Sequence, residues 1–141
     1  MKFRVFIDTT AFIYSFEFAK SNSAKIIELL NKGAIEVTIS ERVVKEITRY
    51  FEKFYGIALA RKFRRFLFDN CKIISAQDIE NKMHELKGKI KDKDLEQLAA
   101  VRQYGIKYLI AYDRDFENFE EYITPKRFLE IIGEEFSESD F

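Results

Sequence analysis

The sequence predicts an α/β fold, a three-layer α/β/α sandwich with a mostly parallel central sheet. Short apolar runs typical of buried strands alternate along the chain with segments of helical periodicity. Strands that alternate with helices imply crossover connections, which place helices on both faces of a parallel sheet. The 141 residues, 47% of them hydrophobic and 34% charged, suffice for one domain with its own core. We therefore expect residues 1–141 to form a single domain.

Each predicted element has a local signal. The run FRVFI is typical of a buried strand, Ser40 suits the N-cap of a long helix, Gly33 and Gly105 can end helices, and Pro125 suits a first helical turn. The acidic tail, residues 134–141, is expected to be frayed. In chain order we expect strand 2–7, helices 11–18 and 23–31, strand 34–39, a helix from 41 to about 54, helix 57–68, strand 71–74, helices 76–90 and 94–104, strands 108–112 and 121–124, and helix 125–132.

Composition excludes several classes of protein and site. Cys71 is the single cysteine and His84 the single histidine, so neither an internal disulfide nor a zinc site built from Cys and His ligands is expected. The first residues lack the apolar length of a signal peptide, and no run of about 18 apolar residues occurs. We expect a soluble, cytoplasmic protein that makes no membrane contact.

Charge is distributed unevenly, although the net charge is zero. Residues 41–65 carry eight basic and three acidic side chains, whereas residues 113–141 carry three basic and ten acidic ones. The basic middle could meet phosphate, or it could simply be a solvated helix face.

Two of the predicted strands end directly in an aspartate, at Ile7-Asp8 and at Tyr112-Asp113. The carboxyl ends of parallel strands share one edge of the sheet, where ligands bind in folds of this class. The sequence therefore predicts that Asp8 and Asp113 lie on the same edge.

Each candidate acid also has an ordinary structural interpretation. Asp8 could be an N-cap, although Thr9 and Thr10 could serve equally well. Glu46 could pair with Arg42 and Arg49 on a solvated helix face.

The later acids have similar alternatives. Asp94 could cap a helix together with Gln97, with Asp92 competing for that role. Asp113 and Asp115 could be turn residues. If several of these carboxylates converge, however, they repel one another unless a cation neutralises them, and oxygen ligands suit hard divalent ions that act on phosphate esters.

Four segments follow one another along the chain, namely FIDTTAFIYSF, ISERVVKEITRYF, DLEQLAAVRQYGIKYLIAYDRDF and YITPKRFLEII. In this order they resemble the motifs of the PIN domain family, which includes VapC-like toxins. The resemblance covers nearly the whole chain. It implies a PIN-like α/β/α domain, commonly dimeric, that cleaves RNA endonucleolytically with Mg²⁺ or Mn²⁺. On the matching positions, the metal ligands and catalytic acids would be Asp8, Glu46, Asp94 and Asp113, with Asp115 as a further ligand or flanking group.

The toxin branch of the family further implies an antitoxin partner whose tail covers the active site. The basic side chains that would contact the RNA backbone are Arg42, Arg49, Arg61, Arg64 and Arg65.

One departure from the family pattern bears on activity. Ala111 stands two residues before Asp113, where many members have Thr or Ser, and Thr10 could supply the missing hydroxyl. The alternative to a ribonuclease is therefore a catalytically silent PIN-like module that binds RNA or protein. A phosphatase of the haloacid dehalogenase type is disfavoured, because Thr10 occupies the position where that chemistry needs a second aspartate.

Overall fold

The structure is a computed structural model that describes residues 2–141. Within this range the chain forms five β-strands and seven α-helices, joined by short 3-10 turns and loops. In chain order these are β1 (Phe3–Ile7), α1 (Thr9–Glu17), α2 (Asn22–Asn31), β2 (Ile35–Ser40), α3 (Glu41–Tyr55), α4 (Ile57–Asn70), β3 (Cys71–Ile74), α5 (Glu80–Leu86), α6 (Leu95–Gln103), β4 (Tyr108–Ile110), β5 (Tyr122–Ile123) and α7 (Pro125–Ile131).

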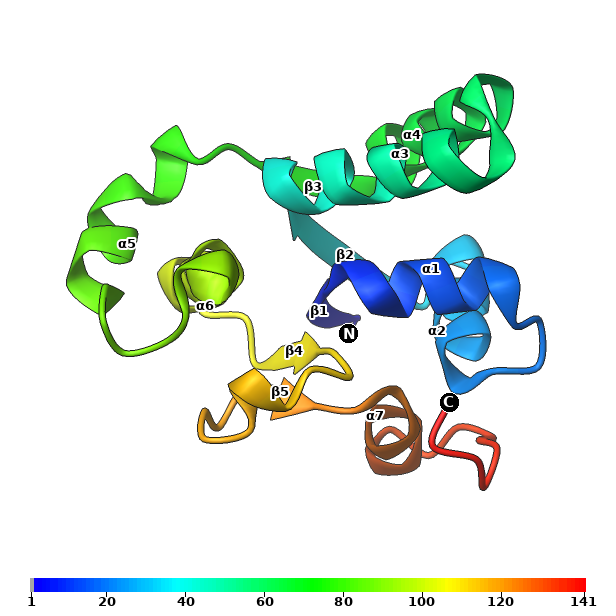
Figure 1. The fold of residues 1–141 in the computed structure, drawn as a ribbon. Coiled ribbons are helices and arrows are strands. Elements are labelled where there is room, and N and C mark those ends of the chain that lie inside the picture. The colour runs from blue at the N-terminus through cyan, green and yellow to red at the C-terminus, as the bar shows by residue number, and fades with distance from the viewer. Residues whose placement is uncertain (1) are drawn as a thin grey trace.

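The strands form one sheet in the order β3-β2-β1-β4-β5, and every neighbouring pair is parallel. Helices α5 and α6 lie on one side of this sheet, and α1, α2 and α7 lie on the other (Figure 1). The α/β/α sandwich predicted from the sequence is therefore confirmed. In the part of the chain that the structure describes, no helix is both long and apolar enough to cross a membrane.

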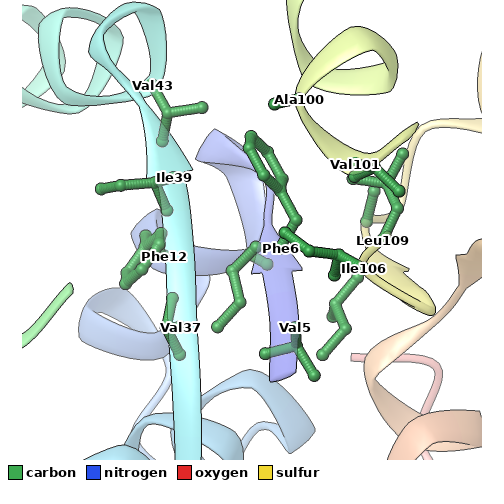
Figure 2. Packing of buried hydrophobic residues seen from close by; sticks show 14 of the residues in the cluster. Val5, Phe6, Phe12, Val37, Ile39, Val43, Ala100, Val101, Ile106 and Leu109 are labelled. Atoms are coloured by element: carbon green, nitrogen blue, oxygen red, sulfur yellow. The ribbon is translucent and has the colours of Figure 1, made fainter. Parts of the chain in front are cut away.

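Strand β1 is the centre of the core. Its residues Val5, Phe6 and Ile7 are at most 1% exposed, so both faces of the strand are covered. Side chains from β2, α1, α3 and α6 pack around it (Figure 2). Burial on both faces is the reason why the run VFI lacks the polar alternation of a half-exposed strand.

Several predicted elements were too long; the strand expected over residues 121–124, for example, spans only Tyr122–Ile123. The helix expected over residues 76–90 is a 3-10 turn (Gln77–Ile79) followed by the short helix α5, and the chain leaves this helix near Gly88, whose φ of 89° a right-handed helix cannot accommodate. The strand expected to reach residue 112 ends at Ile110. Asp113 therefore follows the strand after two intervening residues rather than directly.

The C-terminal tail differs from the expected frayed end. It has no helix or strand, but it is docked on α2 through Asn22, whose side chain is fully buried. The Asn22 amide nitrogen donates to the carbonyl oxygens of Ser137 (3.1 Å) and Ser139 (3.0 Å), and its oxygen accepts from the Ser137 N–H (2.7 Å). The ring of Phe141 packs against Tyr14 and Tyr112. These contacts hold a segment whose acidic composition alone suggested disorder.

Candidate metal centre

At the carboxyl end of β1 lies the position at which parallel α/β sheets have their ligand-binding crevice. From this strand the chain order runs to β2 and β3 on one side and to β4 and β5 on the other, which makes it the switch point at which ligands bind in such sheets. Ile7 is in register with Ile110, and the N–H of Asp8 donates to the Ile110 carbonyl (3.0 Å). Asp8 is thus fixed beside the end of β4.

The Asp8 carboxylate is buried, at 8% exposure, and faces polar groups from another part of the chain. Asp8 occupies the N-cap position of α1, but within residues 2–141 its side chain makes no capping hydrogen bond. Instead, Nε2 of Gln97 donates to its Oδ1 (3.3 Å). Burial raises the pKa of Asp8 to about 6, an effect opposed by the Thr9 N–H and Gln97 and increased by the negative charges of Glu46 and Asp94.

Glu46 points from α3 toward this aspartate. The hydroxyl of Thr9 donates to its Oε1 (3.1 Å), and Arg42 Nε lies 3.9 Å from the same oxygen. The pairing with Arg42 expected of a solvated face is therefore present, yet it does not turn Glu46 away from the crevice. The hydroxyl that enters the site is that of Thr9, whereas Thr10 is exposed.

Asp94 is 5% exposed at the start of α6, and it makes no side-chain capping bond within the described chain. Gln97, the partner expected for a capping box, contacts Asp8 instead. Among the residues that the structure describes, Asp94 Oδ2 has no hydrogen-bond partner. Burial raises the pKa of Asp94, the neighbouring Lys93 lowers it, and the charges of Asp113 and Asp115 raise it further. The Lys93 ammonium lies 3.7 Å from this oxygen, beyond hydrogen-bond distance, and a buried carboxylate oxygen without a hydrogen bond is costly, so this position is suited to a cation.

The carboxylates of Asp94, Asp113 and Asp115 form a triad in which one oxygen of each lies within 4.8 Å of the others. Asp113 is also the turn residue that the sequence allowed, since its Oδ1 accepts the Asp115 N–H (2.9 Å). That bond leaves Oδ2 of Asp113 facing the triad. Asp115 therefore belongs to this 4.8 Å group as Asp113 does, whereas Asp8 and Glu46 do not.

A lysine that sequence reasoning overlooked fills the triad. Nζ of Lys93 lies 3.7 Å from Asp94, 3.3 Å from Asp113 and 3.3 Å from Asp115, while Lys91 lies 3.2 Å from the other oxygen of Asp115. The hydrogen bond to Asp113 is the main reason that the pKa of Lys93 is raised, and the hydrogen bonds of Lys91 and Lys93 lower that of Asp115. The repeated lysines of the segment KIKDKD, next to a candidate acid, were the available signal.

The oxygen ligands of the site fit a hard divalent ion. Three carboxylates converge closely enough to share one ion, one of them keeps a buried oxygen without a donor in the described chain, and an ammonium group already lies among them. Oxygen-only sites of this kind suit Mg²⁺ or Mn²⁺ and do not suit ions that prefer sulfur. The thiol of Cys71 is partly buried, and burial raises its pKa to about 12, so it remains protonated.

The basic residues considered for RNA contact fall into two groups. Arg42 and Arg49 line a pocket of about 350 Å³ together with Glu46. Arg49 also lines a second pocket with Arg64, whose guanidinium lies 4.8 Å from the centre of the Phe68 ring. Arg65 is 3.7 Å from Asp69 on the exposed face of α4. The residues nearest the acids are therefore those of α3, while Arg61, Arg64 and Arg65 belong to α4.

Comparison with known proteins bears on the fold and the family of the chain. A family model described as PIN domain matches residues 4–115. A toxin–antitoxin complex from Klebsiella pneumoniae has a chain that superposes with a TM-score of 0.69 at 22% identity, with coverage of 86% of this chain and 97% of that one. VapBC2 from Rickettsia felis, bound to a DNA fragment from its promoter, has a chain that superposes with a TM-score of 0.67 at 16% identity, with coverage of 86% of this chain and 96% of that one. The toxin VapC20 from Mycobacterium tuberculosis, which cleaves the sarcin–ricin loop, superposes with a TM-score of 0.60 at 19% identity, with coverage of 81% of this chain and 93% of that one.

A comparison with curated proteins found no match. At these identities the solved structures establish the shared fold, whereas the family match covers most of the sequence, including Asp8, Glu46, Asp94, Asp113 and Asp115. The protein belongs to the PIN domain family.

Proposed function

We propose that this protein is an endoribonuclease that hydrolyses RNA phosphodiester bonds with Mg²⁺ or Mn²⁺. The observation that carries the proposal is the triad of Asp94, Asp113 and Asp115, with oxygens within 4.8 Å of one another at the ligand-binding edge of the sheet. Family membership supports the nuclease, and the likeness in fold to a toxin that cleaves the sarcin–ricin loop supports RNA as the substrate.

In this proposal Asp8, Glu46, Asp94 and Asp113 hold the metal, with Asp115 as a further ligand. A bound divalent ion would polarise the phosphodiester and favour formation of hydroxide from water. The protein's own groups orient the acids, because Gln97 donates to Asp8 and Thr9 donates to Glu46. One of these oriented carboxylates positions the attacking water and accepts its proton.

The second candidate is a catalytically silent PIN-like module. Two observations favour it: Ala111 provides no hydroxyl where many family members have one, and Lys93 occupies the space among the three aspartates. The two functions differ in whether the acids bind a metal ion that supports cleavage.

The test combines cleavage with metal binding. Wild-type protein should cleave a fluorophore-labelled single-stranded RNA when Mn²⁺ is supplied and should stop when EDTA is added. Asp8→Asn should lose cleavage while its circular dichroism spectrum stays unchanged, and Asp92→Asn, the substitution of an exposed neighbouring acid, should keep it. Calorimetry should show a Mn²⁺ site that disappears in Asp94→Asn. Equal cleavage by wild type and Asp8→Asn would indicate a contaminating nuclease, and no Mn²⁺ site in the wild type would favour the silent module.

We further propose an antitoxin protein as a partner, supported by the toxin–antitoxin complexes among the structures with the same fold. Large apolar side chains are exposed around the tip of the α3–α4 hairpin, among them Phe54, Tyr55 and Ile57. This apolar surface could serve either the antitoxin or a second copy of the chain in a homodimer. Light scattering of the purified protein, alone and co-expressed with the product of the neighbouring reading frame, distinguishes these assemblies.

A further inference from the structure

The pocket lined by Arg42, Glu46 and Arg49 lies beside the candidate metal centre. It has a volume of about 350 Å³ and lies between the first half of α3 and the start of α6. Glu46 lines the pocket and also accepts the hydrogen bond of Thr9, the residue after Asp8, so the pocket adjoins the candidate metal centre. Its charged lining is balanced, with three cations (Arg42, Lys45 and Arg49) and three carboxylates (Glu41, Glu46 and Glu96).

Glu96 is the unusual residue of this pocket. Its side chain is only 6% exposed, and in the described part of the chain its Oε1 has no hydrogen-bond partner. The backbone N–H of Arg42 faces the same carboxylate, but the Arg42 guanidinium lies near Glu46. A buried carboxylate oxygen without a donor costs stability, so its retention in a pocket wall indicates that a ligand supplies the missing donor.

The lining defines the chemistry of that ligand. Oε1 of Glu96 lacks an N–H donor in the described chain, and the cations of α3 at the pocket wall offer contacts for an anionic phosphate. A nucleotide combines both, since its phosphate is anionic and the bases of A, C and G carry an exocyclic amine. Carboxylates recognise such amines, and unpaired RNA exposes them on the Watson–Crick edge. Uracil has no exocyclic amine, and its single N3–H donor lies between two carbonyl oxygens, which a carboxylate repels.

We propose that this pocket binds one nucleotide of single-stranded RNA next to the cleavage site, with the exocyclic amine of its base donating to Glu96 Oε1. The inference rests on the proposed ribonuclease function only for the choice of RNA as the polymer. Glu96 is thus a specificity residue that selects an amino base over uracil, and the cations of α3 hold the adjacent phosphates.

The test measures binding in the Asp8→Asn background, in which cleavage is blocked. The probes are fluorescent oligouridylates with one central variable nucleotide, offered as pairs with and without the amine: cytidine and zebularine, adenosine and purine riboside, guanosine and inosine. At least one amine should strengthen binding by about tenfold in fluorescence anisotropy. Adding Glu96→Met should remove this difference, Glu96→Gln should retain part of it, and Glu28→Met, on the exposed face of α2, should leave it intact.

The outcomes separate this inference from the ribonuclease proposal. If amino bases bind selectively but the wild type shows no Mn²⁺-dependent cleavage, the nucleotide pocket is supported and the ribonuclease proposal is refuted. If the wild type cleaves RNA but binding shows no preference for amines, the nucleotide-pocket proposal is refuted. It is also refuted if Glu96→Met weakens the binding of every probe equally. Thermal unfolding establishes that Glu96→Met is folded, and Glu96→Gln, which keeps the shape of the side chain, provides the comparison if it is not.

Discussion

Replacing Asp8 by asparagine should stabilise the metal-free protein at neutral pH while abolishing its metal-dependent activity. Burial raises the pKa of Asp8 from 3.8 to about 6. Because one pKa unit corresponds to about 1.4 kcal/mol, keeping this carboxylate charged in the folded state at pH 7 costs about 3 kcal/mol. Asparagine removes the charge, and its carbonyl oxygen can still accept the hydrogen bond from Gln97.

The direction of the pH dependence follows from the same shift. The folded state binds the Asp8 proton more tightly than the unfolded state does, so protonated Asp8 favours folding. This contribution is fully present below pH 3.8 and is lost as the pH rises through about 6. The pKa of Asp94 is also raised, so the difference between wild type and Asp8→Asn is the quantity that isolates Asp8.

Urea unfolding followed by circular dichroism in EDTA measures this difference. Asp8→Asn should exceed the wild type by about 3 kcal/mol at pH 7, or on the order of 10 °C in Tm, and should match it near pH 4. Saturating Mn²⁺ should stabilise the wild type but not the variant, because a ligand stabilises only a folded state that binds it. Asp92→Asn should match the wild type both in stability at pH 7 and in its stabilisation by Mn²⁺. A variant less stable than the wild type at pH 7, or a difference that does not change with pH, would refute the reasoning.

Three further substitutions test individual contacts. Lys93→Met should strengthen Mn²⁺ binding several-fold in calorimetry. The Lys93 ammonium group lies 3.3 Å from both Asp113 and Asp115 and therefore competes with the ion. An unchanged Mn²⁺ affinity would show that displacing Lys93 from the triad costs no binding free energy. Asn22→Ala should destabilise the protein by roughly 1–3 kcal/mol and speed amide exchange in residues 137–141, since buried polar groups of the tail lose their partners; unchanged exchange would contradict this account of docking. Ala111→Ser should increase the Mn²⁺-dependent cleavage rate by restoring the hydroxyl found in many family members, and an equal or lower rate would show that the site does not need it.

The central part of the fold could be predicted from sequence because its signals are local. The strand β1 and the position of Asp8 after it follow from one apolar run that is buried on both faces. The end of β4 could not be predicted in this way. Residues 111 and 112 continue the apolar run, yet the paired part of the strand ends at Ile110, and sheet pairing depends on neighbours distant in sequence.

The candidate acids were identifiable from sequence, but their contacts were not. Helical spacing places Glu46 beside the apolar face of α3, and it is the contact with Thr9, 37 residues away in sequence, that turns it to the crevice. Gln97 had the spacing of a capping partner for Asp94, yet it contacts Asp8, 89 residues distant. Local rules propose the partner that is near in sequence, whereas the folded chain brings these residues other partners across the crevice.

The donors that contact the candidate acids come mostly from other segments of the chain. Thr9, adjacent to Asp8, donates to Glu46; Gln97, one turn after Asp94, donates to Asp8; and Lys93, adjacent to Asp94, contacts Asp113 and Asp115. Glu46, Asp8 and the turn of residues 113–115 are thus each held by a donor from a different segment, whereas the cation near Asp94 is Lys93 of its own segment. Carboxylates gathered without a cation repel one another, and these donors reduce the repulsion only once β1, α3, α6 and the loop after β4 have all docked. The acid group should therefore form together with the core as one cooperative unit, which is why a single change such as Asp8→Asn can alter both metal binding and global stability.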